Sequence, residues 1–318
     1  MTADLARVEA QLLESVRSDE DFLTEIASHL ITAGGKRVRP GFCIAAAATT
    51  LAEDATASAE AVSGGVAVEL VHLGSLYHDD VMDEAEVRRT VDSVNARWGN
   101  LRAILAGDFL LARASELAAD LGTEVAGLLA ATISRLCEGQ LLEIQHAHDL
   151  GRTEASYLRS IEGKTASLLS AACRIGGIVA GAPRWQIDAL TAFGRSYGMA
   201  FQLVDDVLDL VATDEQLGKP AGHDLEEGVY TLPVLHTLAG PDGDELRELL
   251  GSPLEEPARR KALDIVRNGD GIGCAIDAAR AHAAEGRAIL EGLPPSPGAT
   301  GLSAAADYLL RSVEAAAA

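Results

Sequence analysis

The sequence predicts an all-α protein, and three observations carry that prediction. Apolar residues recur at spacings of three and four, the period of an amphipathic helix, whereas the alternation of a strand is nowhere sustained. Hydrophobic residues make up 48% of the 318 residues but aromatic residues only 4%. Alanine, leucine, glutamate and arginine, which favour helices, dominate the periodic stretches. We therefore expect a large, alanine-rich helical core.

The first half of the chain contains a series of helical patterns. Leu5, Val8 and Leu12 begin one that continues to residue 32 and breaks at the glycines of "AGGKRVRPG". A nearly all-apolar helix follows, and then a long one that ends in an acidic motif. We expect the helices at about residues 3–32, 42–52, 57–84, 101–119, 123–148 and 153–181.

The second half continues the same pattern, with short breakers such as "GAP", "GPDG" and "PPSPG" between helices. We expect helices at about residues 184–212, 229–240, 244–250, 255–268 and 270–291, and a final short one after residue 301. None of the breakers is long enough to be a flexible linker, and no repeat of 20 to 50 residues is visible. A single domain over 1–318 is therefore expected.

Charge and cysteine content exclude several classes of function. A formal net charge of -22 would repel a phosphate backbone, which argues against nucleic acid as a partner. Four widely spaced cysteines fit reduced thiols in the cytoplasm better than disulfides or a zinc site. The acidic N-terminus does not resemble a signal peptide, and no apolar segment predicts a transmembrane helix. We expect a soluble, cytoplasmic protein that can still touch a membrane surface.

Two acidic motifs suggest a metal site. "HDDVMDEAEVRR" at 78–89 and "FQLVDDVLDL" at 201–210 both contain Asp-Asp-x-x-Asp, in which the first and last aspartates share a helix face and repel each other. Oxygen ligands without histidine or thiolate suit Mg²⁺, which takes one or two carboxylates and completes its shell with water and phosphate. A single such triplet is equally well a solvated helix face. Two of them, flanked by apolar residues, favour a clamp for a diphosphate.

Basic residues cluster in short glycine motifs. "GGKRVRP" presents Lys36, Arg37 and Arg39, and of only four lysines in the chain two more lie in "EGKT" and "LGKP". Arginine forks and lysine ammonium groups suit phosphate oxygens. Each motif alone is more often a helix cap or surface turn. His72 is either a core histidine or a ligand, and Gln202 is either a core amide or a polar ligand.

These motifs together resemble the trans-isoprenyl diphosphate synthase (polyprenyl synthetase) family, over nearly the whole chain. The order is "GGKRVRP", "HDDVMDEAEVRR", "AGDFLLA", "GKT", "FQLVDDVLD", "LGKP", "TLP". The resemblance implies a single-domain isoprenoid synthase fold of about ten core helices around a central cavity, a homodimer, and head-to-tail condensation of isopentenyl diphosphate with an allylic diphosphate. It implies Mg²⁺ as cofactor, as three ions with substrate bound, with Mn²⁺ as a possible substitute.

The resemblance also assigns roles to single residues. Asp79, Asp83 and Asp205 would bind Mg²⁺, supported by Asp80, Asp206 and Asp209. Arg88, Lys164 and Lys219 would hold the allylic diphosphate. Lys36, Arg39, His72 and Arg89 would hold isopentenyl diphosphate, with Phe201 near its hydrocarbon part. Thr165 and Gln202 would stabilise the allylic cation. Val229 stands where relatives often carry a lysine, so this loop lacks a cation that the resemblance leads one to expect.

The residues before Asp79 predict the product length. In short-chain relatives the position one turn earlier is aromatic, and here Val71, Gly74 and Ser75 form a small chain-length floor while Tyr77 faces elsewhere. We expect a product longer than farnesyl, from geranylgeranyl to a long polyprenyl chain, that can be delivered to a membrane. The alternatives are a class I terpene cyclase and a non-catalytic subunit of a heteromeric synthase.

Overall fold

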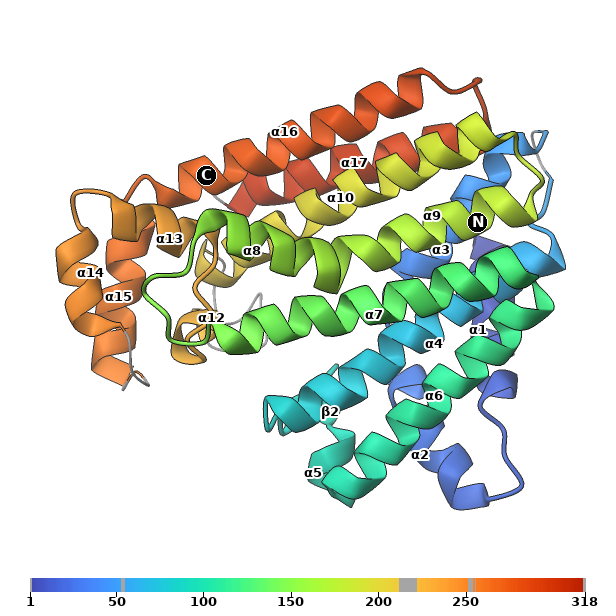
Figure 1. The fold of residues 1–318 in the computed structure, drawn as a ribbon, viewed down its shortest axis with the longest axis horizontal. Helices are drawn as coiled ribbons and strands as arrows, with labels where there is room; N and C mark the ends of the chain where they lie inside the picture. Colours follow the sequence, from blue (N-terminus) through green and yellow to red (C-terminus); the bar gives the residue numbers. More distant parts are fainter. Residues whose placement is uncertain (1, 53–54, 212–221, 251–253, 255, 317–318) are drawn as a thin grey trace. The chain divides into compact units, whose positions relative to one another are not determined.

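A computed structural model describes residues 2–52, 55–211, 222–250, 254 and 256–316. Its contacts divide the chain into two compact units, which are described separately below. Unit 1 comprises residues 1–133, 168–191 and 293–302, and unit 2 comprises residues 134–167, 192–292 and 303–318. The described residues are almost entirely helical, so the predicted all-α class is confirmed (Figure 1).

The elements of unit 1 begin with four helices and a short hairpin. They are α1 (Thr2–Ser15), α2 (Asp21–Thr32), α3 (Val38–Ala47), a 3-10 turn (Ala48–Thr50), α4 (Ala59–Met82), β1 (Val87–Arg88), β2 (Val91–Asp92), α5 (Val94–Trp98) and α6 (Asn100–Asp120). The two strands pair antiparallel, with Val87 opposite Asp92 and Arg88 opposite Val91. Four helices, α7 (Thr123–Gln145), α9 (Ser167–Val179), α10 (Arg184–Val211) and α17 (Pro297–Ala316), contain residues of both units.

The single helix predicted over residues 3–32 is wrong, because the chain forms two helices there. Ser18 and Asp19, which bond local backbone more readily than they continue a helix, lie in the break. The Ser18 amide donates to Thr24 Oγ1 at 3.0 Å and the Glu20 amide donates to Ser18 Oγ at 3.2 Å. These side-chain bonds stabilise the turn, which apolar periodicity alone does not reveal.

Helix α4 forms the centre of unit 1, packed against α6 and α3 (Figure 1). Ser58 caps it, since its Oγ accepts a hydrogen bond from the Ala61 amide at 3.1 Å. Val66, Leu70 and Leu73 are fully buried, and so is most of the helix on all sides. A helix that is apolar all round belongs in a core. Its C-terminal end carries the first acidic motif.

Unit 2 has a second hydrophobic core around the helices that follow the other acidic motif. Its elements are α8 (Glu154–Ile161), a π-helical turn (Glu162–Ala166), α12 (His223–Glu226), α13 (Leu232–Ala239), α14 (Gly243–Leu249), α15 (Glu256–Asn268) and α16 (Gly271–Glu291). Helix α13 packs on α16 and α14 (Figure 1). Leu210, Tyr230 and Val234 are among the buried residues of this core.

Two helices, α17 and α7, differ from the sequence expectation in length or in apolar character. The final helix, α17, is 20 residues long rather than short. By length and composition alone, helix α7 could cross a membrane, and among the described residues it is the only helix that meets both criteria. A core helix of a soluble protein meets the same criteria. In its most apolar stretch only 22% of the residues are buried.

Candidate functional site

The first acidic motif lies where α4 ends. The helix stops at Met82, and the amide of the C-cap residue Asp83 donates to the Asp79 carbonyl at 2.8 Å. Asp79 is half-buried, Asp80 is buried and Asp83 is exposed. The motif therefore combines one carboxylate inside the protein with two that reach solvent.

Asp80 is fixed by Arg88, which the sequence assigned to a diphosphate. Arg88 Nε and Nη2 lie 2.7 and 2.6 Å from Asp80 Oδ1. Arg88 belongs to strand β1 of the hairpin, not to a continuation of α4. Burial raises the pKa of Asp80, and the ion pair with Arg88 only partly offsets that effect. The buried Asp80 Oδ2 has no hydrogen-bond partner among the described residues.

The cations assigned to isopentenyl diphosphate occupy unit 1 as well. Lys36 is exposed, whereas Arg39 and His72 are half-buried. Burial lowers the pKa of Arg39. Burial, followed by the proximity of Arg39, Arg89, Arg88 and Arg37, holds the pKa of His72 well below its usual value. His72 is consequently a neutral imidazole at pH 7, set among arginines.

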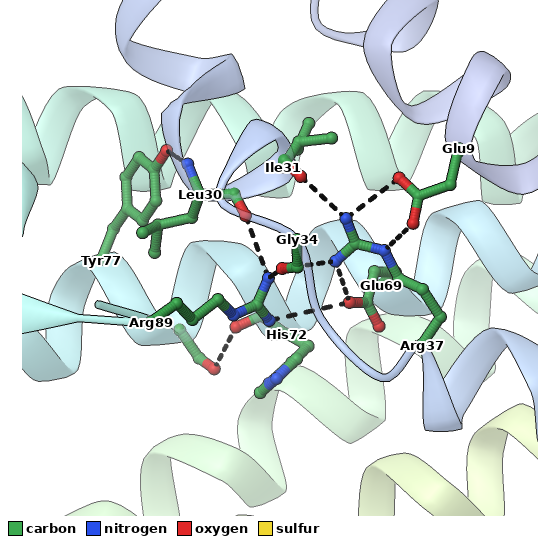
Figure 2. Close-up of polar contacts among 10 residues, drawn as sticks. Glu9, Leu30, Ile31, Gly34, Arg37, Glu69, His72, Tyr77 and Arg89 are labelled. Carbon is green, nitrogen blue, oxygen red and sulfur yellow. Dashed lines mark hydrogen bonds and ion pairs between the residues drawn. The ribbon is translucent and has the colours of Figure 1, made fainter. Parts of the chain in front are cut away.

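Arg37 is not presented to a ligand, contrary to what its place in "GGKRVRP" suggests. Its guanidinium is buried, with Nε 2.6 Å from Glu9 Oε1, Nη1 3.0 Å from Glu69 Oε1 and Nη2 3.0 Å from the Ile31 carbonyl (Figure 2). Glu69 also faces Arg89, whose Nη2 lies 3.9 Å from Oε1. A buried carboxylate thus stands between two guanidinium groups.

The glycine before Lys36 is required by these arginines. Gly35 has φ +154°, and a Cβ there would lie 2.9 Å from Nη1 of both Arg37 and Arg89. In the structure, the groups that approach Gly35 closely are the two guanidiniums.

The second acidic motif lies on α10 in unit 2. Asp205 is exposed, while Asp206 and Asp209 are buried. Asp209 Oδ2 accepts a hydrogen bond from the Asp224 amide at 3.3 Å, and its carbonyl accepts one from the Gly222 amide at 2.8 Å. As in the first motif, buried carboxylates with protein partners adjoin one that reaches solvent.

A chain of hydrogen bonds leads from Asp206 to the residues assigned to the allylic cation. Tyr157 Oη donates to Asp206 Oδ2 at 2.5 Å, and Gln202 Nε2 donates to Oδ1 at 2.7 Å. Gln202 Oε1 in turn accepts from Thr165 Oγ1 at 2.7 Å. Burial raises the pKa of Asp206 to about 7, against the lowering effect of these hydrogen bonds. The structure thus joins Thr165 and Gln202 in one network.

Lys164 projects from the π-helical turn between α8 and α9, where it pairs with Glu143 of α7. A π-turn inside a helix frequently marks a functional site. Here it coincides with a backbone contact, because a Cβ at Gly139 would lie 2.5 Å from the Lys164 amide nitrogen and one at Gly163 would lie 3.0 Å from the Gly139 Cα. Two glycines therefore let α7 and the turn touch at this point.

Two of three further positions named in the sequence analysis can be placed. Phe201 stacks on Tyr197, with ring centroids 6.2 Å apart. Val229 is half-buried, and its amide donates to the Asp224 carbonyl at 2.8 Å. Lys219 lies outside the described residues.

The three positions expected to form the chain-length floor have different surroundings. Val71 is fully buried and Ser75 is half-buried, with its hydroxyl donating to the His72 carbonyl at 2.9 Å. A Cβ at Gly74 would lie 3.1 Å from the Gly107 carbonyl and 3.2 Å from Leu111 Cγ, both on α6. Gly74 therefore makes room for α6, whereas Ser75 lies nearer the face of Asp79.

Several residues that contact the predicted site residues belong to no sequence motif. Tyr157 and Arg152 are recognised only from their contacts in the structure. Arg152 Nη1 donates to the Tyr230 carbonyl at 3.2 Å, and the Arg152 guanidinium lies 5.4 Å from the centroid of the Tyr157 ring. Glu69 had a signal, because a lone acid in the apolar run "VAVELVHL" needs a buried partner.

Within the part of the chain that the structure describes, no three histidine, cysteine, aspartate or glutamate side chains converge as a finished metal site. The donor set nevertheless suits a hard cation, since each motif supplies carboxylate oxygens that Mg²⁺ supplements with water and phosphate. The buried, unbonded Oδ2 of Asp80 is one such oxygen.

Comparison with known proteins identifies the family. The family model for polyprenyl synthetase matches residues 20–266. The nonaprenyl diphosphate synthase of Mycobacterium tuberculosis is 42% identical, over 96% of this chain and 91% of the relative. The heptaprenyl diphosphate synthase component 2 of Geobacillus stearothermophilus is 38% identical, over 92% and 91%.

A solved structure is similar over nearly its full length. The polyprenyl synthase of Caulobacter crescentus, complexed with calcium and isoprenyl diphosphate, aligns with a TM-score of 0.90 and 34% identity, covering 97% of this chain and 94% of the other. This match and those above agree with the resemblance that the motifs indicated. The chain belongs to the polyprenyl synthetase family of prenyltransferases.

Proposed function

We propose that the protein condenses isopentenyl diphosphate head-to-tail with an allylic diphosphate in a Mg²⁺-dependent reaction, giving a product longer than farnesyl. One observation carries the proposal: each acidic motif locks one carboxylate in place, Asp80 through Arg88 and Asp206 through Tyr157 and Gln202, beside aspartates that reach solvent. The aspartates that reach solvent can bind a Mg²⁺ ion that completes its shell with water and a substrate diphosphate.

The metal ligands proposed are the solvent-reaching Asp79, Asp83 and Asp205, supported by Asp80, Asp206 and Asp209. Their oxygen-only donor set favours Mg²⁺. The family resemblance implies three ions in the substrate complex, with Mn²⁺ as a substitute. The Caulobacter crescentus relative complexed with calcium and isoprenyl diphosphate supports a divalent cation next to such a ligand. When bound, the metal supplies positive charge that neutralises the diphosphate.

The allylic substrate would be held by Arg88, Lys164 and Lys219. As the allylic C–O bond breaks, these cations stabilise the charge that develops on the leaving diphosphate. Thr165 and Gln202, joined by their hydrogen bond, would face the carbocation with oxygen dipoles. The double bond of isopentenyl diphosphate then attacks the cation, a carbon–carbon bond forms, and the released diphosphate takes the proton that is lost.

Isopentenyl diphosphate would be held by Lys36, Arg39, Arg89 and His72, with Phe201 near its hydrocarbon part. The neutral state that burial imposes on His72 makes it a hydrogen-bond donor rather than a further cation. The Nε of Arg39 is buried and has no partner among the described residues, so it is available to a ligand oxygen. This part of the proposal assigns recognition, not chemistry, to these side chains.

Product length follows from the small residues Val71 and Ser75 that precede Asp79. The nonaprenyl and heptaprenyl names of two relatives support a long chain. We further propose that the whole chain is one catalytic domain in the cytoplasm, because the family match includes residues of both units and all four cysteines are free thiols.

A homodimer is proposed through α6. Leu101 and Leu105 on this helix are 80% and 64% exposed, and Ile104 beside them is 41% exposed. An apolar cluster of this kind on a surface helix marks an interaction site. A second copy of the chain is the proposed partner, in line with the dimer that the family resemblance implies.

One experiment tests the reaction. The purified chain is incubated with labelled isopentenyl diphosphate and each of the dimethylallyl, geranyl and farnesyl primers, with Mg²⁺ or with EDTA. A synthase incorporates label only with Mg²⁺ and yields products longer than farnesyl. A terpene cyclase converts the primer without incorporating label. A non-catalytic subunit gives no product alone, an outcome worth separating because one relative is named as component 2 of its enzyme.

A further inference from the structure

The C-terminal end of α2 is held by two arginines. The last carbonyls of a helix have no partner within it and carry partial negative charge. Here the Leu30 carbonyl accepts a hydrogen bond from Arg89 Nη1 at 3.0 Å, and the Ile31 carbonyl accepts one from Arg37 Nη2 at 3.0 Å. The Gly34 carbonyl, just beyond the helix, accepts from both arginines (Figure 2). The end of α2 thus fixes both guanidinium groups.

These contacts determine which edge of Arg89 is left for a ligand. Both Nη1 hydrogens are used by Leu30 and Gly34, while Nη2 lies 3.9 Å from Glu69, beyond hydrogen-bond distance. The backbone of Arg89 and of Thr90 is left-handed, with φ of 53° and 65°. Since this conformation is unfavourable for side chains with a Cβ, tertiary contacts must hold it. Arg89 is therefore oriented by α2, leaving its Nε–Nη2 edge to bind another group.

Tyr77 in turn fixes α2 to α4. Its ring is fully buried, and its hydroxyl donates to the Ile26 carbonyl at 2.8 Å and accepts from the Leu30 amide at 3.4 Å (Figure 2). The hydroxyl thus lies beside the α2 residue whose carbonyl holds Arg89. Because Tyr77 is two residues before Asp79, it connects the first acidic motif to the end of α2 through one side chain.

We propose that Tyr77 is a positioning residue for isopentenyl diphosphate, acting through the carbonyl end of α2 to orient Arg89. The inference rests on the proposed function, because it takes Arg89 as a ligand of that substrate. Tyr77 itself touches no substrate. Its hydroxyl sets the place of Leu30 relative to α4, and the Leu30 and Gly34 carbonyls set the direction of the guanidinium.

Arg37 and Glu69 complete the arrangement. Arg37 uses its donors on Glu9, Glu69, Ile31 and Gly34, so it braces the loop after α2 rather than binding a ligand. Glu69 separates Arg37 from Arg89 and reduces the repulsion between them before an anion binds. The cation site is thereby preorganised, which lowers the cost of binding the substrate.

The test is Tyr77→Phe, which removes the hydroxyl and keeps the ring. Initial rates are measured with one substrate varied and the other saturating. We expect the KM for isopentenyl diphosphate to rise about five- to tenfold, the effect of one lost hydrogen bond, while the KM for the preferred allylic primer stays within about twofold of wild type. A merely structural role would not separate the two KM values.

Thr32→Ala is the matched control. The exposed Thr32 hydroxyl donates to the His29 carbonyl at 2.9 Å, so it too bonds the end of α2, but among the described residues its side chain forms no hydrogen bond with α4 or Arg89. Both KM values should be unchanged in this variant. Equal KM values in Tyr77→Phe and wild type, or an equal rise for both substrates, would overturn the inference.

A measurement on the wild-type protein keeps the inference testable if Tyr77→Phe does not fold. Isopentenyl diphosphate should slow hydrogen exchange of the amides of residues 26–34, because a ligand on Arg89 stabilises the carbonyls that hold it. Unchanged exchange at saturating ligand would contradict the role of α2. Failure of the wild type to incorporate isopentenyl diphosphate at all would instead refute the proposed function.

Discussion

The Tyr157 hydroxyl donates a 2.5 Å hydrogen bond to the buried carboxylate of Asp206. This bond connects the start of the α8 segment with the second acidic motif, and it holds one aspartate in place while its neighbour Asp205 reaches solvent. A buried carboxylate that loses such a donor is left with an unsatisfied oxygen.

Replacing Tyr157 with phenylalanine should weaken metal use. Because Asp206 loses one of its two side-chain donors, the motif is held less firmly, and the Mg²⁺ concentration that gives half-maximal activity should rise. The free energy of unfolding should fall by about 1–3 kcal/mol. Activity titrations with Mg²⁺ and urea denaturation measure the two effects, and an unaltered Mg²⁺ dependence would contradict a positioning role for Tyr157.

The stability of the divalent-free protein should depend on pH through Asp206. Burial raises the pKa of Asp206 from 3.8 to about 7, so the folded state retains a proton that the unfolded state has lost. The unfolding free energy should therefore fall as pH rises from about 4 to about 7, by on the order of a few kcal/mol. Asp206→Asn removes this contribution, and identical pH profiles for variant and wild type would show that it is absent.

Asp79→Ala and Asp205→Ala should each reduce turnover by roughly two to three orders of magnitude, the scale of losing a charge-stabilising group. Neither side chain is buried in the core, so the melting temperature should change little. Turnover and thermal unfolding are measured together on each variant. Near-normal turnover in either one would rule out that residue as a metal ligand.

Ser75→Phe should shorten the product, which mass analysis of the prenyl chain would show. Ser75 lies roughly 40° from Asp79 around the helix, whereas Gly74 lies roughly 140° away. A phenylalanine at Gly74 would instead meet Gly107 and Leu111 of α6 and destabilise the protein. An unchanged chain length in Ser75→Phe would refute the floor assignment at that position.

Much of the fold, and the family, was predictable because the signals are local. Apolar periodicity placed the long helices, and paired aspartates with glycine-flanked cations indicated diphosphate chemistry. The break between α1 and α2 was not predictable, since it depends on a hydrogen bond between Ser18 and Thr24 across the turn. The buried role of Arg37 was not predictable either, because its motif does not reveal the ion-pair partner Glu9, which is 28 positions earlier in the sequence.

Tyr157 and Arg152 show a second limit of prediction from the sequence. Neither belongs to a motif, and their importance arises from contacts with Asp206 and Tyr230, 49 and 78 positions away in the sequence. Tertiary packing determines such contacts, and no spacing rule predicts them. Glu69 is the intermediate case, because its isolation in an apolar helix indicates a buried partner without identifying which one.

The meeting of Gly139 and Gly163 restricts how this enzyme can diverge. Because backbone packs against backbone here, neither position has room for even a methyl group. Lys164 belongs to the π-helical turn that this contact supports. Mutational drift should leave both glycines untouched while the exposed flanks of the same helices vary freely. In a saturation library of active variants, glycine should be the only residue found at either of these two positions.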